Sequence, residues 1–251
     1  MKRHALAALT AILGAERLGA LYHHALPRDG FAWGGPMNGQ GARCRMVAQI
    51  IAAHQPCAII ETGSYRGTTT EWFASFQTPV FSCEANGVNY GFATSRLASH
   101  RHVAIQRSDS RAFLRALDWS ALNASGRPVL FYLDAHWHED LPLAEELAIV
   151  LENCAQPVVV IDDFEVPDDP AYAFDDYGPG KALTWDYVAA IVSRHGLAAA
   201  YPATPSGDET GARRGCLALA RNGALLESAL LRAVTAQGAG ATLRAPEADA
   251  V

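Results

Sequence analysis

The sequence predicts an α/β fold in which helices cover both faces of a mainly parallel sheet. Two observations predict it. Short apolar runs recur from position 57 onward, and stretches that resemble helices separate them. Such alternation is typical of βαβ units, and near-continuous Val, Ile and Leu within the runs is typical of strands buried on both faces. We therefore expect a doubly wound sheet of seven strands, the last two forming an antiparallel hairpin.

Five apolar runs predict the parallel strands. They are CAII (57–60), PVFSC (79–83), HVAIQ (102–106), PVLFYL (128–133) and PVVVI (157–161). Helical stretches such as NYGFATSRLASH and LPLAEELAIVLENC lie between them, and RCRMVAQIIAAH predicts a helix that leads into the first strand. The closing hairpin is predicted from LAAAYPA and GCLALA, which a polar segment with Gly and Pro separates.

The two ends of the chain differ from this central region. The segment MKRHALAALTAILGA begins like a secretory signal, but Glu16 and Arg17 follow at once, and the helical pattern continues to about Tyr22. No run reaches the roughly 20 apolar residues that span a bilayer, so we expect a cytoplasmic protein without a membrane partner. The expected parts are an N-terminal helical extension with a connector (1–42), the folded domain (43–235) and a disordered tail (236–251).

Composition and charge limit the class of partner. The 251 residues carry a formal net charge of -6, and no cluster of Lys and Arg occurs beyond MKR and ARR. Domains that bind a phosphate backbone are usually basic, so we expect no nucleic-acid partner. Five cysteines are scattered without a CxxC motif, which favours neither a disulfide framework nor a zinc site. A homo-oligomer is left open.

Acidic residues follow all five predicted parallel strands. They are Glu61, Glu84, Asp109, Asp134 and the pair Asp162 and Asp163. A single strand-end acid is usually a helix cap or a solvated side chain. Ligands of open α/β sheets, however, bind beyond the carboxyl ends of the strands, so acids in register there predict one acidic crevice. Such a crevice suits a ligand that has a cation, an amine and a ribose diol.

The first strand runs into a glycine loop, ETGSYRGTTT. Gly63 and Gly67 let the backbone approach a ligand closely, and the helix that follows, from Thr68, offers free amide groups in its first turn. Glu84 ends the second strand, where an acid accepts hydrogen bonds from ribose hydroxyls in dinucleotide-binding folds. Asp109 follows the third strand, where an adenine amine can be met. Together these features predict a nucleoside-containing cofactor.

The motifs ETGSYRG, YLDAHW and VVVIDDF, with the acid after the second strand, resemble those of class I S-adenosylmethionine-dependent methyltransferases. The similarity is greatest to metal-dependent O-methyltransferases: the catechol O-methyltransferase type, and the macrocin O-methyltransferase and cephalosporin hydroxylase relatives. The resemblance covers about residues 37–220 of the chain. It implies a Rossmann-like fold and O-methyl transfer from S-adenosylmethionine to a hydroxylated small molecule, such as a sugar or a secondary metabolite.

The resemblance also implies roles for the residues around the crevice. The glycine loop would hold the methionine part of S-adenosylmethionine, with Glu84 on the ribose and Asp109 near the adenine. Tyr65 stands where many methyltransferases have a middle glycine, a departure that the catechol-type enzymes share. The full set of predicted cofactor-binding residues is Glu61, Gly63, Tyr65, Gly67, Thr68, Glu84, Ser108 and Asp109.

Three carboxylates at two neighbouring strand ends predict a metal site. Asp134, Asp162 and Asp163 can present hard oxygen ligands to Mg²⁺ or another divalent cation, because the chain turns at a strand end and neighbours there need not face opposite ways. The alternative is that the Asp pair only caps the next segment; relatives bind a divalent cation at these positions. His136 and His138 are the available catalytic bases beside Asp134, although either can instead be a structural hydrogen-bonding group.

Two features leave alternatives open. The long segment 164–183 predicts a lid whose Tyr172, Phe174 and Tyr177 either line an acceptor pocket or pack the loop down. A hydroxylase with iron held by Asp and His is a second function, but the residues lack a clear arrangement of two His and one carboxylate. A cofactor-binding protein without catalysis is a third, and loss of the metal carboxylates, all present here, would be its sign.

Overall fold

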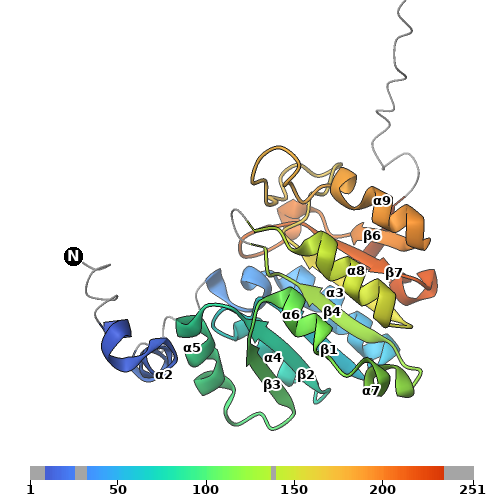
Figure 1. The fold of residues 1–251 in the computed structure, drawn as a ribbon. Helices are drawn as coiled ribbons and strands as arrows, with labels where there is room; N and C mark the ends of the chain where they lie inside the picture. The colour runs from blue at the N-terminus through green and yellow to red at the C-terminus, as the bar shows by residue number, and fades with distance from the viewer. Residues whose placement is uncertain (1–8, 26–32, 137–139, 235–251) are drawn as a thin grey trace, which may run out of the picture.

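The computed structural model describes residues 9–25, 33–136 and 140–234. These residues form the predicted α/β fold, with one mixed sheet and helices on both of its faces (Figure 1). The eight strands follow the order β3-β2-β1-β4-β5-β7-β6-β8. The first five are parallel, and β7 joins β5 in an antiparallel pair. The chain therefore winds outward from β1 in one direction and from β4 in the other.

Each predicted apolar run forms a strand within two residues of its predicted position. The parallel strands are β1 (Ala58–Thr62), β2 (Val80–Glu84), β3 (Val103–Arg107), β4 (Val129–Leu133) and β5 (Pro157–Asp162). The predicted hairpin consists of β6 (Ala198–Pro202) and β7 (Cys216–Ala220), which pair antiparallel. The eighth strand, β8 (Leu231–Ala233), was not predicted, because its sequence LRA contains no apolar run.

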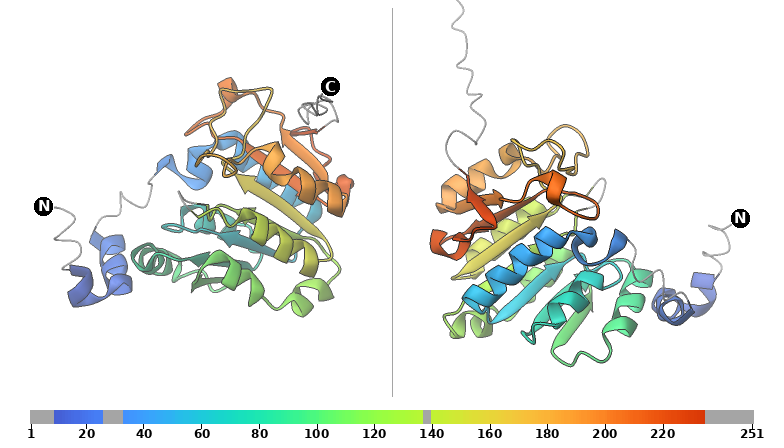
Figure 2. Two further views of the ribbon diagram at one scale, coloured as in Figure 1. Left: turned by 45° about the horizontal axis from the view of Figure 1, so that its top comes forward. Right: turned by 180° about the vertical axis from the view of Figure 1, so that it is seen from behind.

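Helices of the described residues cover the sheet on two sides. They are α3 (Gly41–His54), α4 (Thr68–Ala74), α5 (Gly87–Leu97), α6 (Ser110–Arg115), α7 (Trp119–Ala124), α8 (Leu143–Asn153) and α9 (Trp185–His195). Figure 1 shows α6, α7, α8 and α9 in front of the sheet, and the view from behind in Figure 2 shows α3 and α4 on the opposite face. The strands are therefore buried from both sides, as their near-continuous apolar sequences predict.

Alternate residues of each strand enter two separate cores. Ile60 and Phe131 pack with the front helices, whereas Ile59 and Leu130 pack with α3 and α4. All four side chains are at most 1% exposed. Because burial of a large aliphatic or aromatic side chain stabilises a fold by about 1.5–3 kcal/mol, these two layers hold the strand ends, and hence the residues that follow them, in fixed positions.

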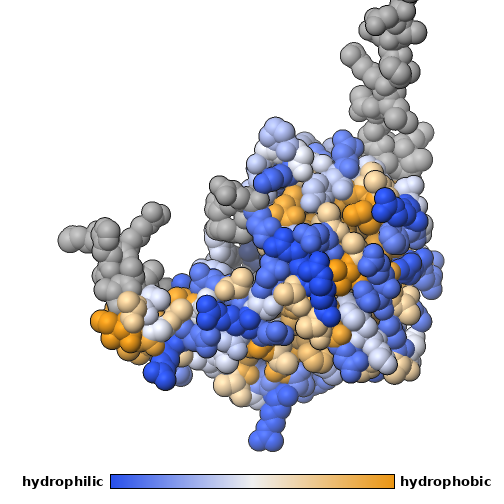
Figure 3. Space-filling model, viewed as in Figure 1, coloured by the Kyte–Doolittle hydropathy of each residue, from blue (hydrophilic) through white to orange (hydrophobic). Residues whose placement is uncertain are grey.

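The predicted N-terminal helix is α2 (Ala15–Ala25), which lies at one side of the sheet against α5 (Figures 1 and 2). Gly19 and Gly91 let the two backbones meet: a Cβ at Gly19 would lie 1.9 Å from the Val88 oxygen. Ile12, just before α2, is 77% exposed, and Figure 3 shows an apolar surface on this segment. The predicted tail lies outside the described residues. Among the helices that are described, none is long and apolar enough to cross a membrane.

Candidate functional site

The candidate site lies beyond the carboxyl ends of β1, β4 and β5. The order of the sheet places β2 on one side of β1 and β4 on the other, so the connections from β1 and β4 leave in opposite directions. In open α/β sheets, a ligand-binding crevice forms at such a reversal. Asp134 and Asp163 directly follow β4 and β5, whereas Glu61 and Asp162 are still within β1 and β5. Glu84 ends β2, and Asp109 follows β3.

The glycine loop is packed tightly between β2 and β4. Gly63 has φ +81°, and a Cβ there would lie 2.2 Å from the main-chain oxygen of Asp134, so only glycine fits this approach. The N–H groups of Gly63 and Ser64 donate to the Cys83 oxygen over 3.1 and 3.0 Å. Tyr65 also has a positive φ, 49°, a conformation that a tyrosine rarely adopts. The loop is thus held in place before any ligand binds.

Glu61 and Glu84 already have hydrogen-bond partners within the protein. The buried Glu61 carboxylate accepts from the hydroxyls of Thr70 and Ser82, each over 2.5 Å, and burial raises the pKa of Glu61 to about 7. Glu84 is partly exposed and accepts from the N–H of Tyr65 over 2.8 Å and of Asn86 over 2.7 Å. Burial raises the pKa of Glu84 as well. Glu84 therefore ties the glycine loop to the end of β2.

Asp109 caps a helix, as strand-end acids usually do. Its carboxylate accepts from the N–H groups of Arg111 and Ala112 at the start of α6. The Arg111 guanidinium donates to it over 2.7 Å and lowers its pKa. The Ser108 hydroxyl donates to the main-chain oxygen of Asp109 over 2.9 Å, and Thr68 accepts from the Arg96 side chain over 3.2 Å. A contact between Asp109 and adenine remains a prediction.

A buried histidine faces three carboxylates on the other side of the crevice. His136 is 4% exposed, and its Nε2 lies 3.8 Å from Asp134 Oδ1, 3.8 Å from Asp163 Oδ2 and 3.7 Å from Asp175 Oδ2. These distances are too long for direct hydrogen bonds. Within the part of the chain that the structure describes, neither ring nitrogen of His136 has a hydrogen-bond partner. Asp134, His136 and Asp163 offer ligand atoms that all lie within 4.8 Å of one another.

The electrostatics of this group are those of crowded like charges. Burial and the charge of Asp163 raise the pKa of Asp134 well above its ordinary value. Burial alone would lower the pKa of His136, but the carboxylates of Asp163, Asp134 and Asp175 raise it. A divalent cation would relieve the repulsion between Asp134 and Asp163 and would give the orphaned His136 nitrogen a partner. The residues present therefore fit a cation site.

Asp162, the third predicted ligand, is not part of this group. Its side chain is fully buried on the α3 face, where it pairs with the Arg43 guanidinium and accepts from the Tyr132 hydroxyl over 2.6 Å. The expectation that Asp162 and Asp163 face the same way is not met, because β5 continues through Asp162, which is in register with Cys216. Strand alternation thus still applies, and Asp163 leaves the strand with φ 52°. His136 takes the third place instead.

Two further members of the site were not identified from the sequence. Arg214 donates through Nε to Asp163 Oδ1 and through Nη2 to Asp175 Oδ1. Asp175 also accepts from the Tyr177 hydroxyl. Arg214 lies two residues before β7, which is the antiparallel neighbour of β5, and this pairing brings it beside Asp163. Asp175 comes from the irregular segment 164–183, where no periodicity indicates which side chains face the crevice.

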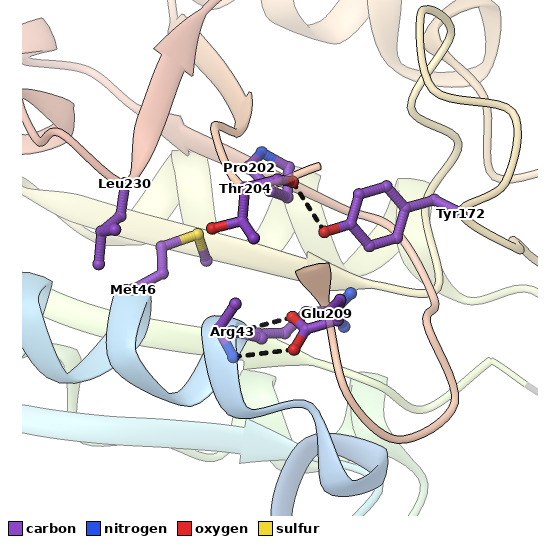
Figure 4. Close-up of a pocket in the computed structure, with 8 residues that line it drawn as sticks. Arg43, Met46, Tyr172, Pro202, Thr204, Glu209 and Leu230 are labelled. Carbon is purple, nitrogen blue, oxygen red and sulfur yellow. Dashed lines mark hydrogen bonds between the residues drawn. The ribbon is translucent and has the colours of Figure 1, made fainter. Parts of the chain in front are cut away.

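The predicted lid is anchored to the body of the protein in several places. Tyr172 is 3% exposed, and its hydroxyl donates to the Thr204 oxygen over 2.9 Å, so it packs the loop down. Phe174 and Tyr177 remain partly exposed. Figure 4 shows Tyr172 at a small pocket with Arg43 and Met46 of α3. The predicted base His138 lies outside the described residues.

Comparison with known proteins supports the fold. No family model and no curated protein sequence matches the chain. An O-methyltransferase from Bacillus cereus in complex with SAH matches with a TM-score of 0.51 and 14% identity, over 72% of this chain and 80% of that one. A candidate O-methyltransferase from Klebsiella pneumoniae gives 0.51 and 16%, over 72% and 80%. The methyltransferase domain of bacterial CtHen1-CN gives 0.51 and 13%, over 71% and 97%. The resemblance to S-adenosylmethionine-dependent methyltransferases is therefore confirmed at the level of the fold.

Proposed function

We propose that the protein transfers a methyl group from S-adenosylmethionine to a hydroxyl oxygen of a small molecule, with the help of a divalent cation. One observation carries this proposal. The glycine loop at Gly63 packs directly on the main chain of Asp134, the first residue of the His136 group. A cofactor held by that loop would therefore have its reactive end beside the carboxylates. The net charge of -6 supports a small acceptor rather than a nucleic acid.

The cofactor would lie along the ends of β1, β2 and β3. Gly63 and Gly67 both have a positive φ, and a Cβ at either would meet the protein, at the Asp134 main chain or at Ala93, so these glycines set the tight path of the loop around the methionine part. The partly exposed Glu84 carboxylate would accept hydrogen bonds from the ribose diol. Because Glu84 also holds the Tyr65 amide, binding of the ribose and the shape of the loop would depend on the same side chain.

Asp134, His136 and Asp163 would hold the cation. Carboxylate oxygens favour Mg²⁺ or Mn²⁺, and an imidazole nitrogen widens the choice toward later divalent metals. When bound, such a cation stabilises the negative charge of an alkoxide or phenolate. Asp162 would not contact the cation. Its buried ion pair with Arg43 would instead hold the end of β5 in place, and Asp163 directly follows that end.

The chemistry requires alignment and removal of one proton. The methyl carbon forms a bond to the acceptor oxygen while its bond to the sulfonium sulfur breaks, which leaves S-adenosylhomocysteine, and the hydroxyl proton passes to a base. The glycine loop on one side of the crevice and the group of Asp134, His136 and Asp163 on the other would supply most of the alignment. A single nitrogen cannot both ligate a cation and accept a proton. If His136 Nε2 holds the cation, the proton goes to His138 or to a carboxylate of the site.

Neither alternative function is favoured by a specific observation. An iron hydroxylase typically has two His and one carboxylate, whereas the described group has one His and two carboxylates. A protein that only binds the cofactor would not need a buried histidine whose nitrogens lack partners within the described residues.

A screen of hydroxylated sugars, phenols and polyketide-like alcohols tests the proposal. Release of S-adenosylhomocysteine from S-adenosylmethionine is measured for each compound, with and without EDTA. We expect turnover with a subset of acceptors, its loss in EDTA and its return with Mg²⁺. Thermal shifts with S-adenosylmethionine, S-adenosylhomocysteine and NAD provide the control that needs no acceptor. Stabilisation by NAD alone would contradict the assignment, and full turnover in EDTA would contradict the role of the cation.

A further inference from the structure

We infer that Asp175 is a fourth donor of the cation site and that Arg214 is the positioning residue that aims both Asp163 and Asp175 at it. This inference rests on the proposed cation site and extends it to the segment 164–183. The site would then be assembled from two strand ends and a loop, with one arginine joining the strand end to the loop.

Asp175 has the same relation to His136 as the two strand-end acids. Its Oδ2 lies 3.7 Å from His136 Nε2, against 3.8 Å for Asp134 and for Asp163. The main chain holds Asp175 there, because its N–H donates to the Asp163 oxygen over 2.9 Å and its oxygen accepts from the Leu183 N–H over 2.9 Å. The position of Asp175 is therefore part of the loop's own backbone structure.

Arg214 binds one oxygen of each carboxylate and leaves the other oxygen facing His136. It donates to the Oδ1 atoms of Asp163 and Asp175, and the Oδ2 atoms of both are the ones that lie 3.8 and 3.7 Å from His136 Nε2. Asp175 Oδ2 also accepts from the Tyr177 hydroxyl, which is a second partner that orients this oxygen. A guanidinium can hold two carboxylates in one plane because its donors form a rigid fork. Carboxylates that ligate metals commonly have such an outer partner, which fixes the orientation of the ligating oxygen.

The backbone of Arg214 is held by hydrogen bonds to buried side chains. Its N–H donates to the Gln40 side-chain oxygen, and its main-chain oxygen accepts from Gln40 Nε2 over 3.1 Å and from the Arg43 guanidinium. Gln40 is fully buried, and Arg43 is 3% exposed. A surface arginine that paired by chance would not need its backbone held by two buried side chains. The contacts therefore preset the direction of the guanidinium.

The charges agree with a divalent ion. With His136 neutral, as a metal ligand must be, the ionised Asp134, Asp163 and Asp175 set three negative charges against the one positive charge of Arg214, and this leaves two in excess. The buried His136 nitrogen is the independent sign of a ligand, since it points at these oxygens and has no hydrogen-bond partner among the described residues. A positioning arginine also lowers the repulsion between the acids that it orients.

Mn²⁺ binding to the cofactor-free protein, followed by calorimetry and by the electron spin resonance of free Mn²⁺, tests the inference. Asp175→Asn should weaken Mn²⁺ binding by about 10–100-fold. Arg214→Lys should weaken it to a similar extent although the charge is unchanged, because an ammonium cannot hold both Oδ1 atoms in the same way. Arg213→Lys, a change at the exposed neighbouring residue, is the matched control and should bind as the parent does.

Three outcomes would overturn the inference. Parent-like Mn²⁺ affinity in both Asp175→Asn and Arg214→Lys would remove these residues from the site while leaving the proposed function intact. Tighter binding in Arg214→Gln would show that the arginine competes with the cation rather than orienting its ligands. Absence of Mn²⁺ binding by the parent would remove both the inference and the cation from the proposed function. The visible spectrum of bound Co²⁺ adds a check of the ligand set, and circular dichroism confirms that each variant is folded.

Discussion

The two walls of the crevice differ in the groups that surround their acids. On the cofactor side, Glu61, Glu84 and Asp109 accept hydrogen bonds at 2.5–3.3 Å from the hydroxyls and amides of the chain itself. On the cation side, His136 lies 3.7–3.8 Å from Asp134, Asp163 and Asp175 without a hydrogen-bond partner in the described residues. Asp163 and Asp175 of the second wall accept from Arg214, so what that wall lacks is a partner for the buried imidazole. In the first wall, the buried side chains without a partner among the described residues are the hydroxyls of Thr62 and Ser64.

This difference shows that acids at equivalent strand ends can have different physical roles. An acid that accepts from its own loop, such as Glu84, shapes the site and then adds a ligand contact to an existing network. An acid that faces another acid across a buried imidazole gains its full stabilisation only when a cation is present. The cofactor side should therefore respond to mutation in stability as well as in binding, and the cation side mainly in catalysis.

The largest effect is expected from the cation side. Asp163→Asn should lower methyl transfer by about 1,000-fold or more, because a cation supplies several kcal/mol of transition-state stabilisation and each 1.36 kcal/mol is tenfold in rate. Affinity for S-adenosylhomocysteine should stay within about twofold. Steady-state release of S-adenosylhomocysteine and calorimetry measure the two quantities. Asp176→Asn, at an exposed acid of the same loop, is the control. Equal turnover in the two variants would show that the cation side is structural.

The difference between the two walls was only partly predictable from the sequence. The strands were predictable because runs such as PVLFYL and PVVVI are too apolar for anything but a buried position. The opposite directions of the Asp162 and Asp163 side chains were not predictable, because they depend on β5 continuing for one more residue before the chain turns. A buried Arg43 within the apolar face of α3 was the available signal, since a buried guanidinium needs a carboxylate partner such as Asp162. Nothing local indicated Asp175, whose position depends on contacts made by a loop.

A second effect concerns pH and the cofactor side. The pKa of Glu61 in the folded protein is about 7, above its ordinary value of 4.5. A raised pKa means that the stabilisation is present below about pH 4.5 and is lost as the pH rises through about 7. Over that range the free energy of unfolding of the parent should fall by up to about 3 kcal/mol more than that of Glu61→Gln.

Urea unfolding at several pH values between 4.5 and 8 measures the difference for Glu61→Gln. The glutamine oxygen can still accept from Thr70 and Ser82, so the variant removes the ionisation while it keeps the hydrogen bonds. Glu71→Gln, at a partly exposed position on α4 where the carboxylate pairs with Arg96, controls for the loss of a negative charge from this region. Parallel pH profiles for the parent and Glu61→Gln would show that Glu61 does not change ionisation in this range.

A third effect, of about 1.5–3 kcal/mol, is expected in cofactor affinity for Glu84→Ala, because hydrogen bonds to a charged acceptor are lost. The variant also frees the amides of Tyr65 and Asn86, which the carboxylate holds in the parent. Glu84→Gln, which keeps an acceptor oxygen, should lose less. Calorimetry with S-adenosylhomocysteine on the folded variants distinguishes them. Unchanged affinity in Glu84→Ala would remove this residue from the cofactor side.

The smallest effect is expected at Asp109, where two variants distinguish a helix-capping role from a contact with the cofactor. Asp109→Ala should lower the free energy of unfolding by about 1 kcal/mol, because the amides at the start of α6 lose their acceptor. Asp109→Ser should restore most of that stability, since serine is also a good cap, but its shorter side chain cannot reach an adenine amine. If Asp109 meets the adenine, both variants should bind S-adenosylhomocysteine more weakly than the parent, by about 0.5–1.5 kcal/mol for one hydrogen bond. Parent-like affinity in Asp109→Ser would instead assign Asp109 wholly to the helix cap, and the cofactor side would then contact the nucleoside through Glu84 and the glycine loop.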